Sequence, residues 1–279
     1  MLTDYHVHLR PDEEGTTAER YFTADNVDRY REAAAERGIE ELGVAEHIHR
    51  FVQSLDIWEH PWYRYWAQDD LDSYCDFVRD QGLKLGIEAD YLRGREDRVA
   101  NLLDGRPWDY VVGSVHFMGD DAVDVHGEPD WEAFDIWRGG DPEKVWSRYF
   151  ETLGEAARTG MFDILAHPDL VKVFGNRVPV PDGDLRHYYE RAMDGIADSD
   201  VAIEVSTAGL RKEAGEIYPA APFLAMCLDA GRPVALSSDA HTPEQIGYEY
   251  ERAVEWLGEL GVSEIAVFEG RSRRLEPLG

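Results

Sequence analysis

Short apolar segments rich in β-branched residues alternate with longer amphipathic segments along the whole chain. This alternation predicts a repeated strand–helix unit, because a parallel strand must be followed by a crossover segment, usually a helix. Seven such units and one more strand fit a closed or nearly closed β/α barrel better than a doubly wound sheet. The first strand is also not followed by a GxGxxG fingerprint, which disfavours a dinucleotide-binding sheet.

The apolar periodicity and the flanking residues assign the expected elements. We expect strands at Thr3–Val7, Glu41–Ala45, Lys84–Ala89, Asp109–Val115, Phe162–Ala166, Val201–Ser206, Pro233–Ser237 and Glu264–Phe268. We expect helices at Ala24–Arg37, Asp69–Gln81, Arg95–Leu103, Pro142–Thr159, Asp184–Ala197, Ala221–Ala230 and Pro243–Gly258. Thr23 is the expected N-cap of the first helix, and Gly38 follows its end. Because no linker, low-complexity run or internal repeat interrupts the series, we interpret residues 1–279 as a single α/β domain.

The net charge limits the class of partner. The chain has 57 acidic and 28 basic residues, which gives a formal net charge of −29. Such a surface repels the phosphates of DNA and RNA and the headgroups of anionic membranes. No apolar stretch reaches the roughly 18 residues of a membrane span, and the first residues show no signal-peptide pattern. We therefore expect a cytoplasmic protein that binds neither nucleic acid nor membranes; the sequence does not indicate its oligomeric state.

Two segments break the regular alternation, Arg50–Gln68 and Phe117–Gly140. The first is rich in aromatic residues and follows the second expected strand, and the other is long, acidic and follows the fourth. Loops at the carboxyl ends of barrel strands form active sites, so both segments are candidate walls or lids. The alternative for the aromatic segment is simple packing against the outside of the barrel by Trp58, Trp62, Tyr63 and Trp66.

Residue types that bind metals recur at the carboxyl ends of the expected strands. Six different strands end in such a side chain, and the ends of parallel strands share one face of the fold. The residues are His6, His8, His47, Glu88, His116, His167, Asp239 and His241. Strand residues i and i+2 point the same way, so the pairs His6–His8 and Asp239–His241 each aim at one point. A lone histidine is usually structural, as we expect for His60, His126 and His187, but this joint placement predicts a metal centre.

The ligand types narrow the choice of metal. Imidazole suits zinc, iron, nickel and copper, whereas carboxylates suit harder ions. A mixed cluster therefore indicates Zn²⁺, Mn²⁺ or Fe, and the number of ligand pairs indicates more than one ion, with Glu88 as the expected bridging carboxylate. Cys75 and Cys227 form no CxxC pair and are interpreted as buried thiols in a reducing compartment.

The ordered motifs resemble those of a known family. The segments DYHVH, AEH, GIEAD, VGSVH, DILAHPDLVK and SSDAH follow one another between Asp4 and about Gly270, and this ordered set resembles the PHP (polymerase and histidinol phosphatase) superfamily. The segments AHPDLVKVFG and EVSTAGLRKEAGEIYP are similar to the histidinol-phosphatase branch. The resemblance implies a distorted seven-stranded (β/α) barrel of the PHP type with a cluster of up to three metal ions. The expected strand Glu264–Phe268 is additional to that barrel.

The resemblance also implies how the ligands are shared. The first metal would take His6, His8, Glu88 and Asp239, the second Glu88, His116 and His167, and the third His47 and His241. Many members add a histidine six residues after the second histidine of HxH, and in this sequence that position is Glu14. A carboxylate there is still able to bind a metal, with a preference for a harder ion such as Mn²⁺ or Fe. Asp12 and Glu13 are the alternatives to Glu14.

A metal cluster of this kind favours hydrolysis of a phosphomonoester, because two metal ions can share a water and lower its pKa. The resemblance implies L-histidinol phosphate as the substrate, with L-histidinol and phosphate as products in histidine biosynthesis. Asp239 or His241 is the candidate for passing a proton to the leaving group, with water as the alternative.

Substrate-binding residues are expected in the same segments. Lys172 and Arg211 are the expected cations for the phosphate, and Ser114 is a candidate hydrogen-bond donor. Lys212 is interpreted as an ordinary solvated charge. The amine and imidazole of the substrate suit a strongly acidic protein. Glu204 and Glu46 are candidates for contacts with this cationic end of the substrate.

Two other functions are compatible with the sequence. The enzyme could act on another small phosphomonoester, a nucleotide or phosphotyrosine, with the same metal cluster and different pocket loops. The chain could also be a catalytically silent, metal-stabilised interaction module. The complete ligand set disfavours this last hypothesis.

Overall fold

Eight short parallel strands form two sheets in the structure, a computed structural model that describes residues 1–279. The strands are β1 (Thr3–Asp4), β2 (Glu41–Val44), β3 (Lys84–Leu85), β4 (Glu88–Asp90), β5 (Val112–Ser114), β8 (Ile164–Leu165), β9 (Ala202–Ser206) and β10 (Val234–Ser237). One sheet has the order β1-β2-β3 and the other the order β10-β9-β8-β5-β4, and all neighbours are parallel. The fold is therefore α/β with parallel strands, as the alternation predicts.

The two sheets meet at both edges through single β-bridges. At one edge His47 pairs with Glu88, and at the other Val7 pairs with Ala240. Backbone hydrogen bonds accompany both bridges: the His8 N–H donates to the Ala240 carbonyl at 2.7 Å, and the Glu88 N–H donates to the Glu46 carbonyl at 2.9 Å. With β3 and β4 counted as one strand, the pairing runs round a ring of seven, which is consistent with a distorted barrel.

The chain passes from one sheet to the other at Gly86. The expected strand Lys84–Ala89 is split here, because its first half pairs with β2 and its second half pairs with β5. A Cβ atom at Gly86 would lie 2.3 Å from the ring of Tyr110, which is fully buried inside the ring of strands. Only glycine leaves room for this tyrosine, so the position where the strand crosses between sheets requires it.

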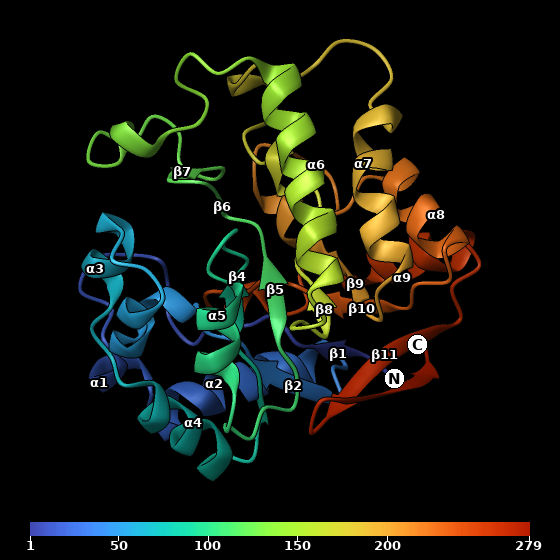
Figure 1. Cartoon of the computed structure of the whole chain (residues 1–279). Helices are drawn as coiled ribbons and strands as arrows, with labels where there is room; N and C mark the ends of the chain where they lie inside the picture. Colours follow the sequence, from blue (N-terminus) through green and yellow to red (C-terminus); the bar gives the residue numbers. More distant parts are fainter.

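Nine α-helices pack around the strands (Figure 1). They are α1 (Ala18–Tyr21), α2 (Ala24–Glu36), α3 (Pro61–Trp66), α4 (Leu71–Asp80), α5 (Glu96–Leu103), α6 (Pro142–Arg158), α7 (Arg186–Ala197), α8 (Ala221–Asp229) and α9 (Tyr250–Glu259). The boundaries of α2 follow the expected signals. The Thr23 side chain accepts a hydrogen bond from the Asn26 N–H at 3.3 Å, and Gly38 has φ 69° after the helix end.

The last helix begins later than the periodicity predicts. Pro243–Gln245 forms only a 3₁₀ turn, and α9 starts at Tyr250. The expected helix Pro243–Gly258 is therefore α-helical only in its second half. Gly247 has φ 58°, and its N–H donates to the buried carboxylate of Asp4 at 3.2 Å. This contact with the first strand outweighs the local helical preference.

Two antiparallel hairpins lie outside the ring of parallel strands. One joins β6 (Phe117–Met118) to β7 (Asp121–Ala122), and the other joins β11 (Glu264–Glu269) to β12 (Ser272–Pro277). The additional strand expected at Glu264–Phe268 therefore exists but has no parallel partner. The chain termini meet beside this hairpin (Figure 1), where the Met1 amino group donates to the Pro277 carbonyl at 2.7 Å.

The two segments that interrupt the alternation pack against each other. Trp131, after β7, lies 4.7 Å from Trp62 and 5.3 Å from Tyr65 of α3, measured between ring centroids. Trp62 and Trp66 line the main cavity, as expected for a wall. Trp58 and Tyr63 are buried and pack against Phe117 of β6.

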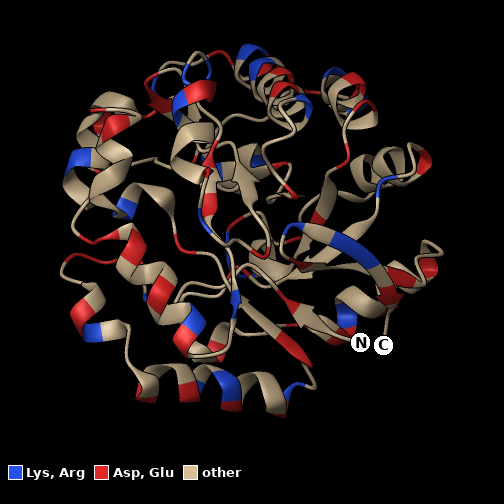
Figure 2. Ribbon diagram, turned by 60° about the horizontal axis from the view of Figure 1, so that its bottom comes forward, with Lys and Arg blue, Asp and Glu red and all other residues tan.

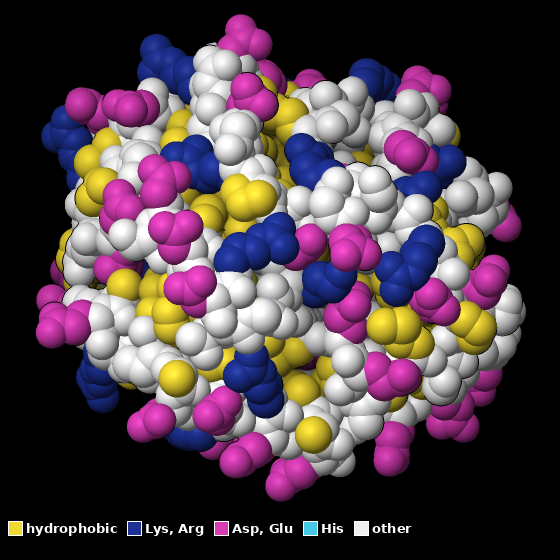
Figure 3. All heavy atoms as spheres, turned by 90° about the horizontal axis from the view of Figure 1, so that it is seen from below, with side chains coloured by type: hydrophobic (Ala, Val, Ile, Leu, Met, Phe, Trp, Pro, Cys, Tyr) yellow, Lys and Arg dark blue, Asp and Glu magenta, His cyan; other side chains and the backbone are white.

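Charged residues are spread over the molecule rather than gathered in one area. Acidic positions recur on the outer helices (Figure 2). The face seen from below in Figure 1 mixes acidic and basic side chains and shows no histidine (Figure 3). None of the helices combines the length and the apolar character needed to cross a membrane.

Candidate metal centre

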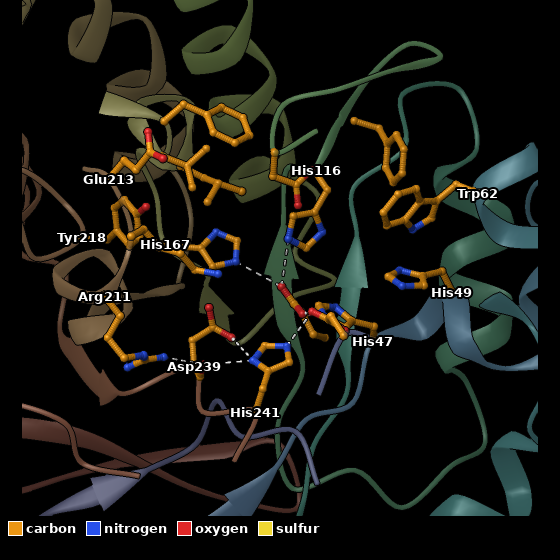
Figure 4. A pocket seen from close by; sticks show the side chains of 18 of the residues that line it. His47, His49, Trp62, His116, His167, Arg211, Glu213, Tyr218, Asp239 and His241 are labelled. Carbon is orange, nitrogen blue, oxygen red and sulfur yellow. Dashed lines mark hydrogen bonds and ion pairs between the residues drawn. The ribbon is translucent and has the colours of Figure 1, made fainter. Parts of the chain in front are cut away.

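Eight of the nine expected metal ligands meet at one end of the strands. His6 and His8 follow β1, His47 follows β2, Glu88 begins β4, His116 follows β5, His167 follows β8, and Asp239 and His241 follow β10. They form four overlapping groups whose ligand atoms lie within 4.8 Å of one another: His6–His8–Asp239, His6–Glu88–His167, His47–Glu88–His116 and His8–His47–His241. Figure 4 shows the side chains of His47, His116, His167, Asp239 and His241 converging from different strands.

Glu88 lies at the centre of the cluster. Its Oε2 atom is 3.3 Å from Nε2 of His6 and 2.5 Å from Nδ1 of His47. Its Oε1 atom is 3.3 Å from Nε2 of His116 and 3.2 Å from Nε2 of His167. Oε2 also lies 3.6 Å from Nε2 of His8. The two carboxylate oxygens thus face different imidazoles, which is the arrangement of a carboxylate that can bridge two metal ions.

Asp239 and Asp12 add carboxylates on two further sides of the cluster. Oδ1 of Asp239 lies 3.7 Å from Nε2 of His6 and 3.5 Å from Nε2 of His8. Oδ2 of Asp12 lies 2.8 Å from Nε2 of His241 and 3.5 Å from Nε2 of His47. Asp12 thus adds a carboxylate to the group formed by His8, His47 and His241.

The donor atoms fit metal ions. Nε2 of His6, Nε2 of His8 and Oε2 of Glu88 are buried and form no hydrogen bond. Buried polar atoms without a partner are rare in folded proteins, and imidazole nitrogens beside carboxylate oxygens are the donors that zinc and similar ions prefer. The residues present therefore match a cluster of divalent metal ions.

The pKa shifts differ across the cluster. Burial lowers the pKa of His6 and His47, but carboxylates such as Glu88 outweigh this effect and hold the pKa of both imidazoles well above its usual value. Burial raises the pKa of Glu88, but the charges of His47, His6 and His116 outweigh this effect and hold the pKa well below its usual value. Burial and the neighbouring imidazoles of His47 and His241 lower the pKa of His8 well below its usual value. An ionised carboxylate and a neutral imidazole are the forms that bind metals.

Two of these ligand positions have an unusual backbone. His167 has φ 22° and Asp239 has φ 49°, although neither is glycine. Such conformations cost about 1–3 kcal/mol each and persist where the surrounding structure enforces them. At Asp239 the guanidinium of Arg211 contributes, because its Nη2 donates to the carbonyl oxygens of Ser238 and Asp239 at 2.9 Å each.

Glu14 does not join the cluster, and Asp12 occupies the place expected for it. Glu14 is exposed and lines a small separate pocket with Arg10 and Tyr65. The loop curls at Thr16, whose hydroxyl donates to the Glu13 carbonyl at 2.7 Å, and the Arg50 guanidinium holds Asp12 by an ion pair. This turn directs Asp12 inward and Glu14 outward, a local geometry that a fixed spacing from HxH cannot predict.

The expected substrate-binding residues have different surroundings. Arg211 lines a cavity of about 590 Å³ above the cluster, and its Nη1 forms no hydrogen bond. Lys172 is buried and lies outside that lining, because its ammonium group is 2.7 Å from Asp169 and 3.0 Å from Glu216. The two carboxylates neutralise Lys172, so the structure contradicts its assignment as a phosphate-binding cation. Ser114 is fully buried and does not line the cavity either.

The cavity wall also contains residues that the sequence reasoning missed. His49 faces it beside Trp62 (Figure 4). Arg177 lines it and pairs with Glu213 at 2.9 Å, and Lys212, interpreted as a solvated charge, lines it without an ion pair. Asp90, below the wall, accepts from Nδ1 of His116 at 2.7 Å. For Asp90 the available signal was its i, i+2 relation to Glu88, since such residues share a side of a strand. His49 lies in a 3₁₀ turn after β2, so no strand periodicity marks it.

Comparison with known proteins agrees with this geometry. Residues 20–208, more than half of the chain, match the family model of the PHP domain. A protein of Deinococcus radiodurans named probable histidinol-phosphatase is 30% identical over 257 residues, which are 89% of this chain and 91% of that protein. The histidinol-phosphatase of Bacillus subtilis is 25% identical over 252 residues, which are 83% and 92% of the two chains.

Solved structures share the fold. Histidinol phosphate phosphatase from Lactococcus lactis, crystallised with zinc, L-histidinol and phosphate, gives a TM-score of 0.74 at 19% identity and covers 98% of both chains. A putative histidinol phosphatase from Listeria monocytogenes gives a TM-score of 0.72 at 21% identity, over 90% of this chain and 99% of the other. The family match, the 30% identical relative and the converging ligands lead to one conclusion: the chain belongs to the PHP domain family.

Proposed function

We propose that this protein is a metal-dependent phosphatase that hydrolyses L-histidinol phosphate to L-histidinol and phosphate. The observation that carries the proposal is the position of the ligand cluster at the floor of a 590 Å³ cavity. The relatives named histidinol-phosphatase and the neighbour with bound zinc, L-histidinol and phosphate support this choice of substrate.

The proposed ligand sets follow the contacts in the cluster. His6, His8, Glu88 and Asp239 would hold one ion, Glu88, His116 and His167 a second, and His47, His241 and Asp12 a third. The neighbour's zinc favours Zn²⁺, with Mn²⁺ and Fe as the alternatives for the set that contains Asp12. Two or three divalent ions bound here supply a water of lowered pKa and positive charge for the phosphoryl oxygens.

The residues of the chain orient the substrate and neutralise its charge. Arg211 has one guanidinium nitrogen fixed by the carbonyls of Ser238 and Asp239, and its Nη1 is buried without a hydrogen-bond partner. We propose that Nη1 donates to a phosphate oxygen when the substrate occupies the cavity that Arg211 lines. A charge-assisted hydrogen bond of this kind is worth about 1.5–3 kcal/mol. Lys212 adds a second positive charge at the cavity wall.

The opposite wall suits the imidazole of the substrate. Trp62, Trp66 and His49 present flat rings to the cavity, and Asp124 adds a carboxylate to the lining. An aromatic wall excludes water and packs against a planar ring, while a carboxylate compensates the amine. Glu46 and Glu204, by contrast, are buried in the strands and do not line the cavity, so we exclude them from this role.

Proton transfer to the leaving alkoxide is proposed for Asp239. Its Oδ1 faces His6, His8 and His241, whereas no hydrogen bond or ion pair involves its Oδ2. Burial raises the pKa of Asp239, but the charge of His6 and the contact with His8 hold it well below its usual value. The carboxylate is therefore ionised at rest, and its free Oδ2 would relay a proton from water to the leaving group. His241 supports this role from the adjacent position and also contacts Asp12.

A cytoplasmic location, which the two buried free cysteines favour, belongs to the same proposal.

The direct test is phosphate release from L-histidinol phosphate by zinc- or manganese-loaded protein. p-Nitrophenyl phosphate and a nucleoside monophosphate serve as competing substrates. A kcat/KM in the range of about 10⁴–10⁸ M⁻¹s⁻¹ for L-histidinol phosphate alone supports the proposal. Similar slow turnover of all three compounds would support phosphatase activity but reject L-histidinol phosphate as the specific substrate. No turnover by metal-loaded protein would favour an interaction module.

A variant of the central carboxylate distinguishes this site from a contaminating phosphatase. Glu88→Gln removes the charge that faces five imidazoles and is expected to lower kcat/KM by at least about 100-fold. Glu155→Gln, at an exposed ion pair with Arg93, is the matched control and should retain activity. Equal activity of Glu88→Gln and the wild type would show that the measured turnover comes from elsewhere.

A further inference from the structure

Strand β9 supplies no metal ligand, yet it carries a carboxylate to the centre of the cluster. The five residues Ala202–Ser206 are all buried. Ile203 and Val205 belong to the large core cluster, whereas Ala202 belongs to the small cluster inside the ring of strands. Because strand residues alternate in direction, Glu204 shares the inward side with Ala202.

Glu204 contacts groups from three neighbouring segments. Its Oε1 lies 2.8 Å from Nδ1 of His6 and accepts from the Ser237 hydroxyl at 2.6 Å. Its Oε2 accepts from the backbone N–H of His167 at 2.5 Å. Both carboxylate oxygens are thus used, and the side chain is only 1% exposed. No substrate could reach it without displacing one of these partners.

The contact with His6 selects one form of the imidazole. A proton on Nδ1 donates to Glu204, so Nε2 carries the lone pair. Nε2 is the atom that faces Glu88 at 3.3 Å and Asp239 at 3.7 Å. A carboxylate behind a metal-binding histidine fixes its tautomer, holds its ring and increases its basicity.

The contact with His167 acts on the backbone. His167 has φ 22°, a conformation that non-glycine residues rarely adopt, and its Nε2 lies 3.2 Å from Glu88. The hydrogen bond from its N–H to Glu204 holds this conformation in place. One carboxylate therefore positions a ligand from the first strand and a ligand that follows β8.

We propose that Glu204 is a positioning residue that sets His6 and His167 relative to Glu88 and thereby determines metal affinity. The inference rests on the proposed metal centre but not on the identity of the substrate. Asp90 has the corresponding place behind His116, with Nδ1 at 2.7 Å. Burying a carboxylate costs more than burying an amide. A glutamine, however, has one acceptor oxygen and an amide nitrogen that donates, so it could not accept from both His6 and the His167 N–H. A carboxylate is therefore the group that can hold both ligands at once.

The test compares Glu204→Gln with Asp109→Asn in the full-length protein. Asp109 is also a buried carboxylate that accepts on both oxygens, from the backbone N–H groups of Leu85 and Gly270, and it pairs with Arg79. None of these contacts involves a residue of the cluster. Zinc content after dialysis and the zinc dissociation constant against a competing chelator are the primary measurements. Glu204→Gln is expected to weaken zinc binding about 10–100-fold, while Asp109→Asn retains wild-type affinity even where its thermal stability falls.

Kinetics give a second readout. At saturating zinc, Glu204→Gln should lower kcat for L-histidinol phosphate while KM changes less than twofold, because Glu204 does not line the cavity. If Glu204→Gln does not fold, Glu204→Asp keeps the charge but is one methylene shorter, and an intermediate loss of zinc affinity is expected. Wild-type zinc affinity in a folded Glu204 variant would overturn the inference. Failure of the wild-type protein itself to bind zinc would instead reject the metal centre.

Discussion

His47 and Glu88 are joined twice, by a parallel β-bridge between their backbones and by a 2.5 Å contact between Nδ1 and Oε2 of their side chains. The backbone bridge is one of the two places where the sheets meet. The other, Val7 with Ala240, lies between His6 and His8 on one strand and between Asp239 and His241 on the other. Both junctions of the ring are therefore flanked by the proposed metal ligands.

Metal removal should consequently lower stability as well as activity. Each junction has a single bridge, so ions bound by ligands on both sides would hold the two sheets together. A ligand at 100 times its dissociation constant stabilises the folded state by about 2.7 kcal/mol. Calorimetry with and without excess chelator should show a lower Tm without metal, restored when zinc is added back. Loss of activity with an unchanged Tm would show that the junctions hold without the ions.

The assignment of Asp12 in place of Glu14 gives a paired prediction. Asp12→Asn is expected to reduce the bound metal by about one equivalent and to lower kcat/KM by roughly 10–100-fold, because Asp12 contacts His241 and His47. Glu14→Gln should match the wild type in metal content and rate. Metal analysis and steady-state kinetics check both variants, and the reverse result would restore Glu14 as the ligand.

Replacing Lys172 or Arg211 by methionine is predicted to have different effects, on stability in the first case and on KM in the second. Lys172→Met leaves the buried Asp169 without its cation and should lower the free energy of unfolding by about 3–5 kcal/mol, measured by urea denaturation. Arg211→Met removes a donor that faces the cavity and should raise KM about 10–100-fold, following the energy of one charge-assisted hydrogen bond. A large KM change in folded Lys172→Met protein would contradict its structural role.

Trp131 is predicted to support the cavity wall without touching the substrate. It packs against Trp62, which lines the cavity, but is not part of the lining itself. Trp131→Ala should raise KM for L-histidinol phosphate about threefold to tenfold, consistent with the roughly 0.5–1.5 kcal/mol of an aromatic pair, with kcat and metal content unchanged. Trp256→Ala, at a separate pocket beside α9, is the control. An unchanged KM in Trp131→Ala would show that the cavity wall does not depend on Trp131.

The sequence was sufficient for the strand order and for most of the cluster because both depend on short-range patterns. Apolar runs mark the strands, and His6, His116 and His167 follow their strands at the carboxyl ends. The parallel arrangement then brings these ends together without further information.

The remaining features depend on contacts that a linear pattern does not encode. The orientation of Asp12 is set by Arg50 and by the turn at Thr16. Lys172 pairs with the nearby Asp169 and also with Glu216, which lies far along the chain. The shortened α9 results from the contact between Gly247 and Asp4. In each case a side chain distant in sequence decides the outcome.

The junction of Val7 with Ala240 also determines when the protein can become active. Its strands come from opposite ends of the chain, so a nascent polypeptide that ends before Asp239 has His6 and His8 but lacks Asp239 and His241. The complete set of proposed ligands exists only after most of the chain has been synthesised and the ring has closed. Glu88, His116 and His167 are present earlier, but prematurely terminated products lack the residues that would complete the other two sets.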